Sequence, residues 1–156
     1  MDKSKIISEL TSKVTKELEK VNQAYVTTKN LVQTGDLKSD GKHDTRATEV
    51  NYLADGQRQR ITELEQELEL LSDIPTKKED KVSIGSLVQI SLNGNSRKYF
   101  IAPTAGGTML NIDGEAILVI SVFSPIGDEA LGHSENETFE IELKDDLREY
   151  HIENIY

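Results

Sequence analysis

The chain has 156 residues, 36% of them hydrophobic and 29% charged, which is typical of one globular domain or two small ones. Its formal net charge of −10 argues against strong binding to DNA, which depends on clustered Lys and Arg, and favours a basic protein partner. Without cysteine the chain cannot form disulfides, thiolate zinc sites or cysteine nucleophiles, and its three histidines are scattered.

Residues 1–5 alternate charged with short polar side chains and lead into an amphipathic pattern. No apolar stretch reaches the length of a signal peptide or of a membrane span. We therefore expect a cytosolic location and no association with a membrane.

Residues 3–33 predict a first helix, because their apolar side chains recur at alternating steps of three and four, the seam of a coiled coil. Glu17 is the one charged interruption, and Leu18 can substitute beside it. The expected seam positions are Ile7, Leu10, Val14, Glu17, Val21, Ala24, Thr28 and Leu31.

Residues 44–72 predict a second helix with the same alternation. At 1.5 Å rise per residue each helix reaches roughly 40 to 45 Å, and we expect the two to pair antiparallel as a hairpin. The expected seam positions are Ala47, Val50, Ala54, Gln57, Ile61, Leu64, Leu68 and Leu71.

The connecting segment, residues 35–44, carries three aspartates, Asp36, Asp40 and Asp44, together with two glycines that favour a loop. Asp44 is also a candidate cap for the second helix, and Asp36 a candidate turn former. A hairpin would hold all three carboxylates at its tip, far from the rest of the protein. We therefore treat the tip as the candidate site.

After residues 74–81 the hydrophobic period changes from 3.6 to 2, which places a domain boundary there. We expect a hairpin domain at 1–75, a linker at 76–81 and a sheet domain at 82–156. The aspartate and glutamate side chains outnumber the basic ones most strongly in this second half, by 14 to 7 over residues 76–156.

The sheet domain is expected to have five strands and one covering helix, which makes the fold class α+β. The sequence Asn93-Gly94-Asn95 predicts a hairpin turn, and the nearly continuous apolar run 115–122 is expected at the centre of the sheet. The strands are predicted around Val88–Leu92, Arg97–Ile101, Glu115–Val122, Thr138–Leu143 and Glu149–Ile155.

One short helix is predicted after the third of these runs. Ser124 would cap it, Pro125 would occupy its first position and Gly132 would end it. Capping and helix start are the simplest roles of these residues.

Over nearly the whole chain, these patterns resemble the Gre family of bacterial transcription elongation factors. Residues 82–88, Val-Ser-Ile-Gly-Ser-Leu-Val, look like the entry strand of that family. Residues 121–127, Ser-Val-Phe-Ser-Pro-Ile-Gly, followed by Ala-Leu-Gly at 130–132, look like its strand-to-helix signature. Arg60 and Ile61 match the second arm of its coiled coil.

The resemblance implies an FKBP-like carboxyl-terminal domain that docks on RNA polymerase through the neighbourhood of Ser124, Pro125, Ile126 and Gly127. It also implies a monomer whose hairpin enters the secondary channel and approaches the 3′ end of the nascent RNA.

In that channel Asp36 and Asp40, aided by Asp44, would hold a second magnesium ion shared with the polymerase, which would then cleave its own backtracked transcript. The protein itself would hydrolyse nothing and would need no cofactor of its own.

The tip departs from the family pattern. Members that stimulate cleavage read Gly-Asp-Leu-Lys-Glu-Asn, whereas Ser39 stands here in the place of the glutamate, next to Asp40. Alignment backwards from Arg60 instead puts Asp40 in the place of the aspartate and His43 in that of the glutamate. Which aspartate lies at the apex stays open.

Three alternatives remain beside a cleavage factor. The first keeps the docking but makes the protein a non-cleaving modulator or inhibitor in the channel, as some Gre-like paralogues are. The second, a coiled-coil scaffold, is disfavoured by the two glycines of the connecting segment. The third, a prolyl isomerase, is disfavoured because the second half has few rings to line a proline pocket and fold does not carry function with it. Those rings are Tyr99, Phe100, Phe123, Phe139, Tyr150 and Tyr156.

Overall fold

The structure, a computed structural model, describes residues 2–33 and 44–156. Two long helices are followed by a mixed β-sheet with one short helix, which confirms the predicted fold class. The chain forms two compact units: Ser12–Leu68, here called the hairpin unit, and Met1–Thr11 with Glu69–Tyr156, here called the sheet unit. Among the described residues, no helix is long and apolar enough to cross a membrane.

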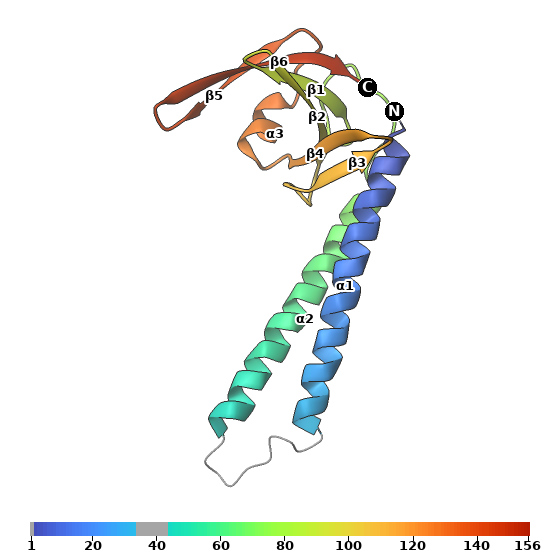
Figure 1. The fold of residues 1–156 in the computed structure, drawn as a ribbon, viewed down its shortest axis with the longest axis vertical. Helices are drawn as coiled ribbons and strands as arrows, with labels where there is room; N and C mark the ends of the chain where they lie inside the picture. The colour runs from blue at the N-terminus through green and yellow to red at the C-terminus, as the bar shows by residue number, and fades with distance from the viewer. Residues whose placement is uncertain (1, 34–43) are drawn as a thin grey trace. The chain divides into compact units, whose positions relative to one another are not determined.

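Helices α1 (Lys3–Gln33) and α2 (Asp44–Ser72) run side by side and antiparallel through the hairpin unit (Figure 1). The predicted seam of α2 is confirmed, because every expected position from Ala47 to Leu71 is buried or half-buried. Ala54 and Leu64 are the most completely enclosed of these positions within the hairpin unit, at 6% and 0% exposure.

The seam of α1 differs from the expected list at three places, one of which is Leu31, whose side chain is 42% exposed. Glu17 is exposed while Leu18 is half-buried, and Ala24 is exposed while Tyr25 is half-buried. The charged carboxylate stays in water, and the larger apolar side chains take the seam. Thr28 does lie in the seam as expected, because its hydroxyl donates a hydrogen bond to the carbonyl oxygen of Ala24 at 2.8 Å and is thereby satisfied.

Arg60 of α2 joins the two helices. Its guanidinium lies 2.7 Å from a carboxylate oxygen of Glu17 on α1 and 3.3 Å from one of Glu63 on its own helix, with Glu67 at 3.9 Å. The hydrogen bond from Arg60 to Glu17 raises the pKa of the arginine above its ordinary value. Because Glu17 lies outside the seam, its carboxylate can form this ion pair with α2.

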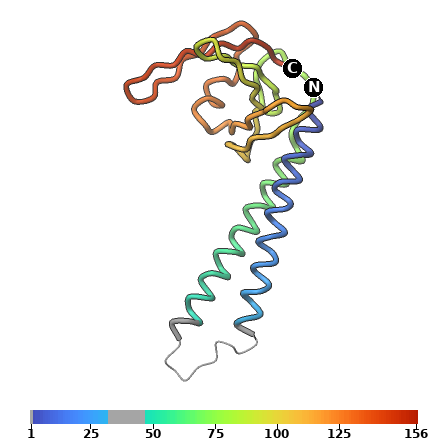
Figure 2. Tube along the Cα trace, in the orientation of Figure 1, coloured from blue at the N-terminus to red at the C-terminus, as the bar shows by residue number. Residues whose placement is uncertain are grey.

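The sheet has six strands in the order β3-β4-β2-β1-β6-β5, and only the β2–β4 pair is parallel. Their bounds are β1 Leu87–Leu92, β2 Asn95–Ala102, β3 Met109–Ile112, β4 Glu115–Ser121, β5 Thr138–Leu143 and β6 Asp146–Ile155. The chain trace in Figure 2 shows the β5–β6 hairpin reaching beyond the other strands of the sheet.

Two sequence predictions about this sheet are wrong. The expected five strands omitted β3, which has only four residues and pairs with β4 through a turn at Asp113 and Gly114. The apolar run of β4 is not central, because β4 lies next to the edge strand β3. Its side chains are apolar on both faces because both are covered, as Val119 and Ile120 are buried in succession.

The predicted turn between β1 and β2 is confirmed. Asn93 and Gly94 have φ values of 52° and 80°, the left-handed conformations that a two-residue hairpin turn requires. Helix α3 (Pro125–Ala130) covers one face of the sheet, where Phe139 stacks on Tyr150 with ring centroids 5.3 Å apart.

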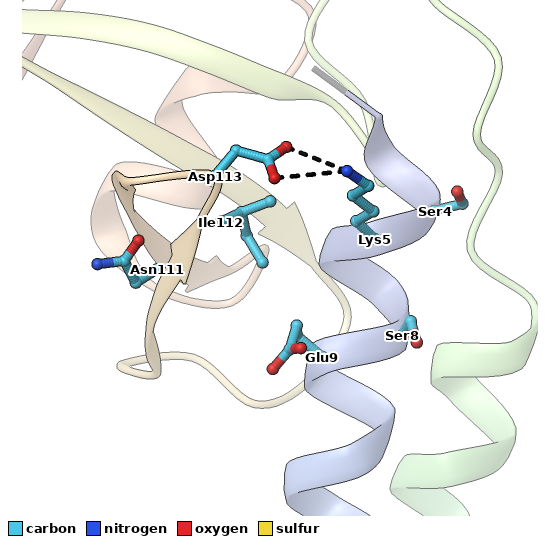
Figure 3. Close-up of a pocket in the computed structure, with 7 residues that line it drawn as sticks. All are labelled: Ser4, Lys5, Ser8, Glu9, Asn111, Ile112 and Asp113. Atoms are coloured by element: carbon cyan, nitrogen blue, oxygen red, sulfur yellow. Dashed lines mark hydrogen bonds and ion pairs between the residues drawn. The ribbon is translucent and has the colours of Figure 1, made fainter.

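The first turns of α1 belong to the sheet unit. The ammonium group of Lys5 lies 3.3 Å from a carboxylate oxygen of Asp113 in the β3–β4 turn, beside a pocket of about 490 Å³ (Figure 3). Lys3 is almost fully buried, donates a hydrogen bond to the carbonyl oxygen of Lys77 at 3.4 Å, and has its pKa lowered by burial. The predicted linker thus lies against the start of the chain.

Candidate functional site

The loop between β4 and α3 contains the predicted docking residues and is held by a compact set of hydrogen bonds. The amide of Val122 donates to the carbonyl of Ala102 at 3.0 Å, which extends the pairing of β4 with β2. The amide of Phe123 then donates to the Ser121 hydroxyl at 3.1 Å, and that of Ser124 to the Ser121 carbonyl at 3.0 Å. Ser121 therefore closes the turn from both its side chain and its backbone.

Ser124 caps α3 as predicted. Its hydroxyl accepts a hydrogen bond from the amide of Gly127 at 3.1 Å and donates one to the carbonyl of Ser121 at 2.7 Å. Pro125 occupies the start of the helix, where its missing N–H costs nothing. Gly132 follows the helix with a φ of 84°, which confirms the predicted stop.

The loop brings the four predicted docking residues, 124–127, into one helical turn. Gly127 is required there, because a Cβ at this position would overlap the carbonyl oxygen of Ser121. Ile126 turns inward and packs against the core of the sheet unit, whereas Pro125 is exposed. The predicted residues therefore divide between shaping the turn and presenting a surface.

Phe123 is a surface residue of this loop that the sequence analysis did not single out. Its side chain is 85% exposed, the highest value among the exposed large hydrophobic residues in the described part of the chain. Its place in the sequence could have indicated this exposure. Phe123 lies two residues after the end of β4 and one before the helix cap, so it belongs to neither element. Phenylalanine is among the residues enriched at the core of protein–protein interfaces, so the loop is a candidate binding surface.

A hollow of about 420 Å³ lies in the sheet unit, with Ile126 of α3 in its wall. Tyr99 and Tyr150 also line it, with exposed fractions of only 9% and 2%. Two arginines, Arg97 and Arg148, complete this part of the lining. Sequence reasoning expected no hollow with tyrosines here. The residues come from β2, β6 and α3, which only the sheet topology brings together.

The polar groups of this hollow are partly engaged. The pKa of Arg148 is raised by its hydrogen bond to Asp146, at 3.0 Å, and further by Tyr150. Burial raises the pKa of Tyr99. The lining therefore combines tyrosine rings and Ile126 with polar side chains, and of its two guanidinium groups that of Arg148 is already paired with Asp146.

The three acids of the predicted tip are not described at the level of their side chains. Asp36 and Asp40 lie outside the described residues, and Asp44 enters only as the first residue of α2. Among the described residues, no group of His, Asp and Glu is arranged to hold a metal ion. The acidic tip and its magnesium ion therefore stay predictions.

A helical hairpin followed by a mixed sheet with a capped short helix is the architecture that the resemblance to the Gre family implies. Residues 77–156 match the family model described as transcription elongation factor GreA/GreB, C-terminal. The match spans just over half of the chain, so the chain belongs to the GreA/GreB family.

Several solved structures match this chain at low sequence identity and low TM-score. The structure of the transcription factor Gfh1 is 20% identical, with 94% of this chain and 92% of that chain covered and a TM-score of 0.41. Gfh1 of Thermus thermophilus is 17% identical, with 94% of each chain covered and a TM-score of 0.38. GreA/GreB from Nitrosomonas europaea is 19% identical over 61% of this chain and 78% of that chain, with a TM-score of 0.36.

At this level of identity and superposition, these structures say nothing about a shared activity. No curated protein sequence matches the chain.

Proposed function

We propose that this protein binds RNA polymerase, inserts its hairpin into the secondary channel and stimulates cleavage of backtracked RNA by the polymerase. The observation that carries the proposal is the family match over residues 77–156, together with a pair of long helices that ends at an acid-bearing segment. The polymerase performs the chemistry, and the protein supplies carboxylates to it. It acts as a monomer in the cytoplasm.

The carboxylates proposed for the metal are Asp36 and Asp40, with Asp44 as a further acid of the tip. Carboxylate oxygens are ligands that magnesium prefers, and the ion is commonly held by one or two of them together with phosphate oxygens. A second magnesium ion, bound only in the polymerase complex near the RNA 3′ end, would supply an activated water and stabilise the leaving oxygen.

The docking surface proposed for the sheet unit is the loop 123–127. Its shape is fixed by the Ser121 and Ser124 hydrogen bonds, so that Phe123 and Pro125 are presented without an ordering cost on binding. The neighbouring hollow, with Arg97 and Arg148, would accept an apolar side chain next to an acidic one.

A second candidate function is favoured by one residue. Ser39 replaces the glutamate expected in cleavage-stimulating tips, and a serine hydroxyl is a weaker ligand for magnesium than a carboxylate. If Asp40 does not compensate, the protein would occupy the channel and modulate transcription without stimulating cleavage.

The test is RNA cleavage in stalled, backtracked elongation complexes with magnesium, with polymerase binding measured in parallel. We expect Asp36→Asn or Asp40→Asn, or both, to lower the stimulated cleavage rate at least about 10-fold, because the loss of even an outer-shell partner of a metal ligand typically costs about 10- to 100-fold. Binding should remain. Asp55→Asn is the control, because Asp55 is an exposed acid of α2 whose ion pair with Arg58 is equally exposed.

The outcomes separate the two candidates. Binding without stimulated cleavage by the wild-type protein would contradict the cleavage function and support the modulator. An absence of binding would contradict both. Cleavage that is equally reduced by Asp55→Asn would show that the effect comes from hairpin charge in general and not from the tip.

A further inference from the structure

A second surface, on the hairpin unit, has no role in the function proposed so far. It is a groove of about 430 Å³ in which both helices take part. Two basic residues, Lys20 and Arg60, complete a lining that is otherwise apolar apart from one amide and one phenol. The other lining residues are Val21, Ala24, Tyr52, Leu53, Gly56 and Gln57.

Large apolar side chains at this groove lie in water. Tyr52 is 73% exposed and Leu53 is 55% exposed, whereas the adjacent seam residue Ala54 is 6% exposed. The seam is therefore complete without them, and they add little to the pairing of the two helices. Exposed apolar residues gathered at one groove are typical of a binding surface.

Gly56 lies in the interior of α2, where glycine is less favourable than alanine because it loses more conformational freedom on folding. A Cβ at this position would meet no atom within 4 Å, so the packing of the hairpin unit does not require a glycine. What the missing side chain provides is room at the groove for the close approach of another molecule.

Two polar groups of the groove define what would fit it. The side-chain oxygen of Gln57 is buried and has no hydrogen-bond partner among the described residues, so it lacks an N–H or O–H donor. Lys20 forms no ion pair with a described carboxylate, whereas the charge of Arg60 is already balanced by Glu17 and Glu63. The groove thus offers a cation and an acceptor beside apolar walls.

We propose that this groove binds a protein segment of RNA polymerase, one that presents an apolar side chain between a carboxylate and a hydrogen-bond donor. The apolar side chain would lie among Val21, Leu53 and the open position of Gly56. The carboxylate would pair with Lys20, and the donor would satisfy Gln57.

Apolar walls and a buried acceptor suit a polypeptide better than the phosphates of RNA. The inference rests on the proposed binding to RNA polymerase and adds a second contact, made by the side of the hairpin rather than by its tip or by the sheet unit.

The first test places a photo-crosslinking amino acid at position 52 or at position 51 and irradiates the complex with purified RNA polymerase. Asn51 is exposed and neighbours Tyr52 but does not line the groove, which makes it the matched control. We expect crosslinking to a protein subunit of the polymerase to be several-fold stronger from position 52. Crosslinking from position 52 to RNA, or to a second copy of this chain, would overturn the proposal.

The second test fills the groove with Gly56→Phe and compares it with Gln66→Phe, which adds the same ring at an exposed position of α2 outside the groove. We expect Gly56→Phe to weaken polymerase binding about tenfold with an unchanged helical circular dichroism signal, and Gln66→Phe to change it less than about twofold. Equal affinities of the two variants for RNA polymerase would overturn the proposal that the groove binds the polymerase and would leave the proposed function intact. An absence of binding by the wild-type protein would overturn both.

Discussion

Gly127 and Gly56 differ in what surrounds their missing side chains. At Gly127 the backbone of the β4–α3 loop comes so close that a Cβ would overlap the Ser121 carbonyl oxygen, whereas at Gly56 the space is open. The first glycine is demanded by the fold of the docking loop. The second is not, and for that reason it indicates a use outside the hairpin unit.

Alanine substitutions separate these two roles. Gly127→Ala should destabilise the protein by about 1–3 kcal/mol, because the loop must shift to admit a methyl group. Gly56→Ala should stabilise it by about 0.5–1 kcal/mol, because alanine has the higher helix propensity and meets nothing. Both are measured by urea unfolding. If Gly127→Ala left the free energy of unfolding unchanged, the loop would have space for a methyl group, contrary to the close contact with the Ser121 carbonyl oxygen.

Among the elements, the helical hairpin has a polar crosslink in addition to its seam. Arg60 contacts Glu17 across the two helices and Glu63 along its own helix, with the arginine side chain 39% exposed. Ion pairs this exposed contribute only about 0.2–1 kcal/mol, since water and salt screen them. The crosslink therefore adds little to the stability of the hairpin, which rests mainly on the buried seam.

A double-mutant cycle of Arg60→Met and Glu17→Gln measures that crosslink. We expect a coupling free energy of about 0.2–1 kcal/mol in low salt that falls at 500 mM NaCl, because screening weakens an exposed pair. Unfolding of the hairpin would be followed by circular dichroism at 222 nm. A coupling that does not change with salt would show that the pair is shielded from water, contrary to its exposure.

The elements also show how far the sequence predicts this fold. The heptad pattern predicted α2 in full, because burial at a seam follows directly from spacing. In α1 it placed Glu17 and Ala24 in the seam, where Leu18, already offered as a substitute, and Tyr25 enter one residue later. It also placed Leu31 in the seam, although that side chain is exposed. Local turn and cap signals predicted Asn93-Gly94 and Ser124-Pro125, since both are decided within a few residues.

What the sequence did not predict depends on contacts between distant residues. Strand β3 is too short to give a pattern, and β4 lies near an edge although its apolar run is typical of a central strand. The hollow beside α3 needs Arg97 and Arg148 from two separate strands, and the groove of the hairpin unit needs both helices. No local pattern brings such residues together.

Across the whole molecule, the charge is unevenly distributed. Residues 134–156, which include the β5–β6 hairpin, carry 8 acidic and 2 basic side chains. Glu140 of β5 lies directly opposite Glu149 of β6, and like charges in that position destabilise a strand pair. This excess of carboxylates therefore has a cost in stability.

Salt should therefore stabilise this protein, although salt weakens its ion pairs. The ion pairs named above are exposed and contribute at most about 1 kcal/mol each, while the net charge of −10 creates repulsion throughout the folded state that salt screens within about 10 Å at 0.1 M. We expect the midpoint of thermal unfolding to rise by about 2–4 °C between 20 and 300 mM NaCl.

Glu140→Lys should raise the midpoint in low salt and reduce this salt response, because it removes two units of net negative charge and turns a repulsive cross-strand pair into an attractive one. A midpoint that falls with salt would mean that the ion pairs outweigh the repulsion, and Glu140→Lys would then lose its advantage.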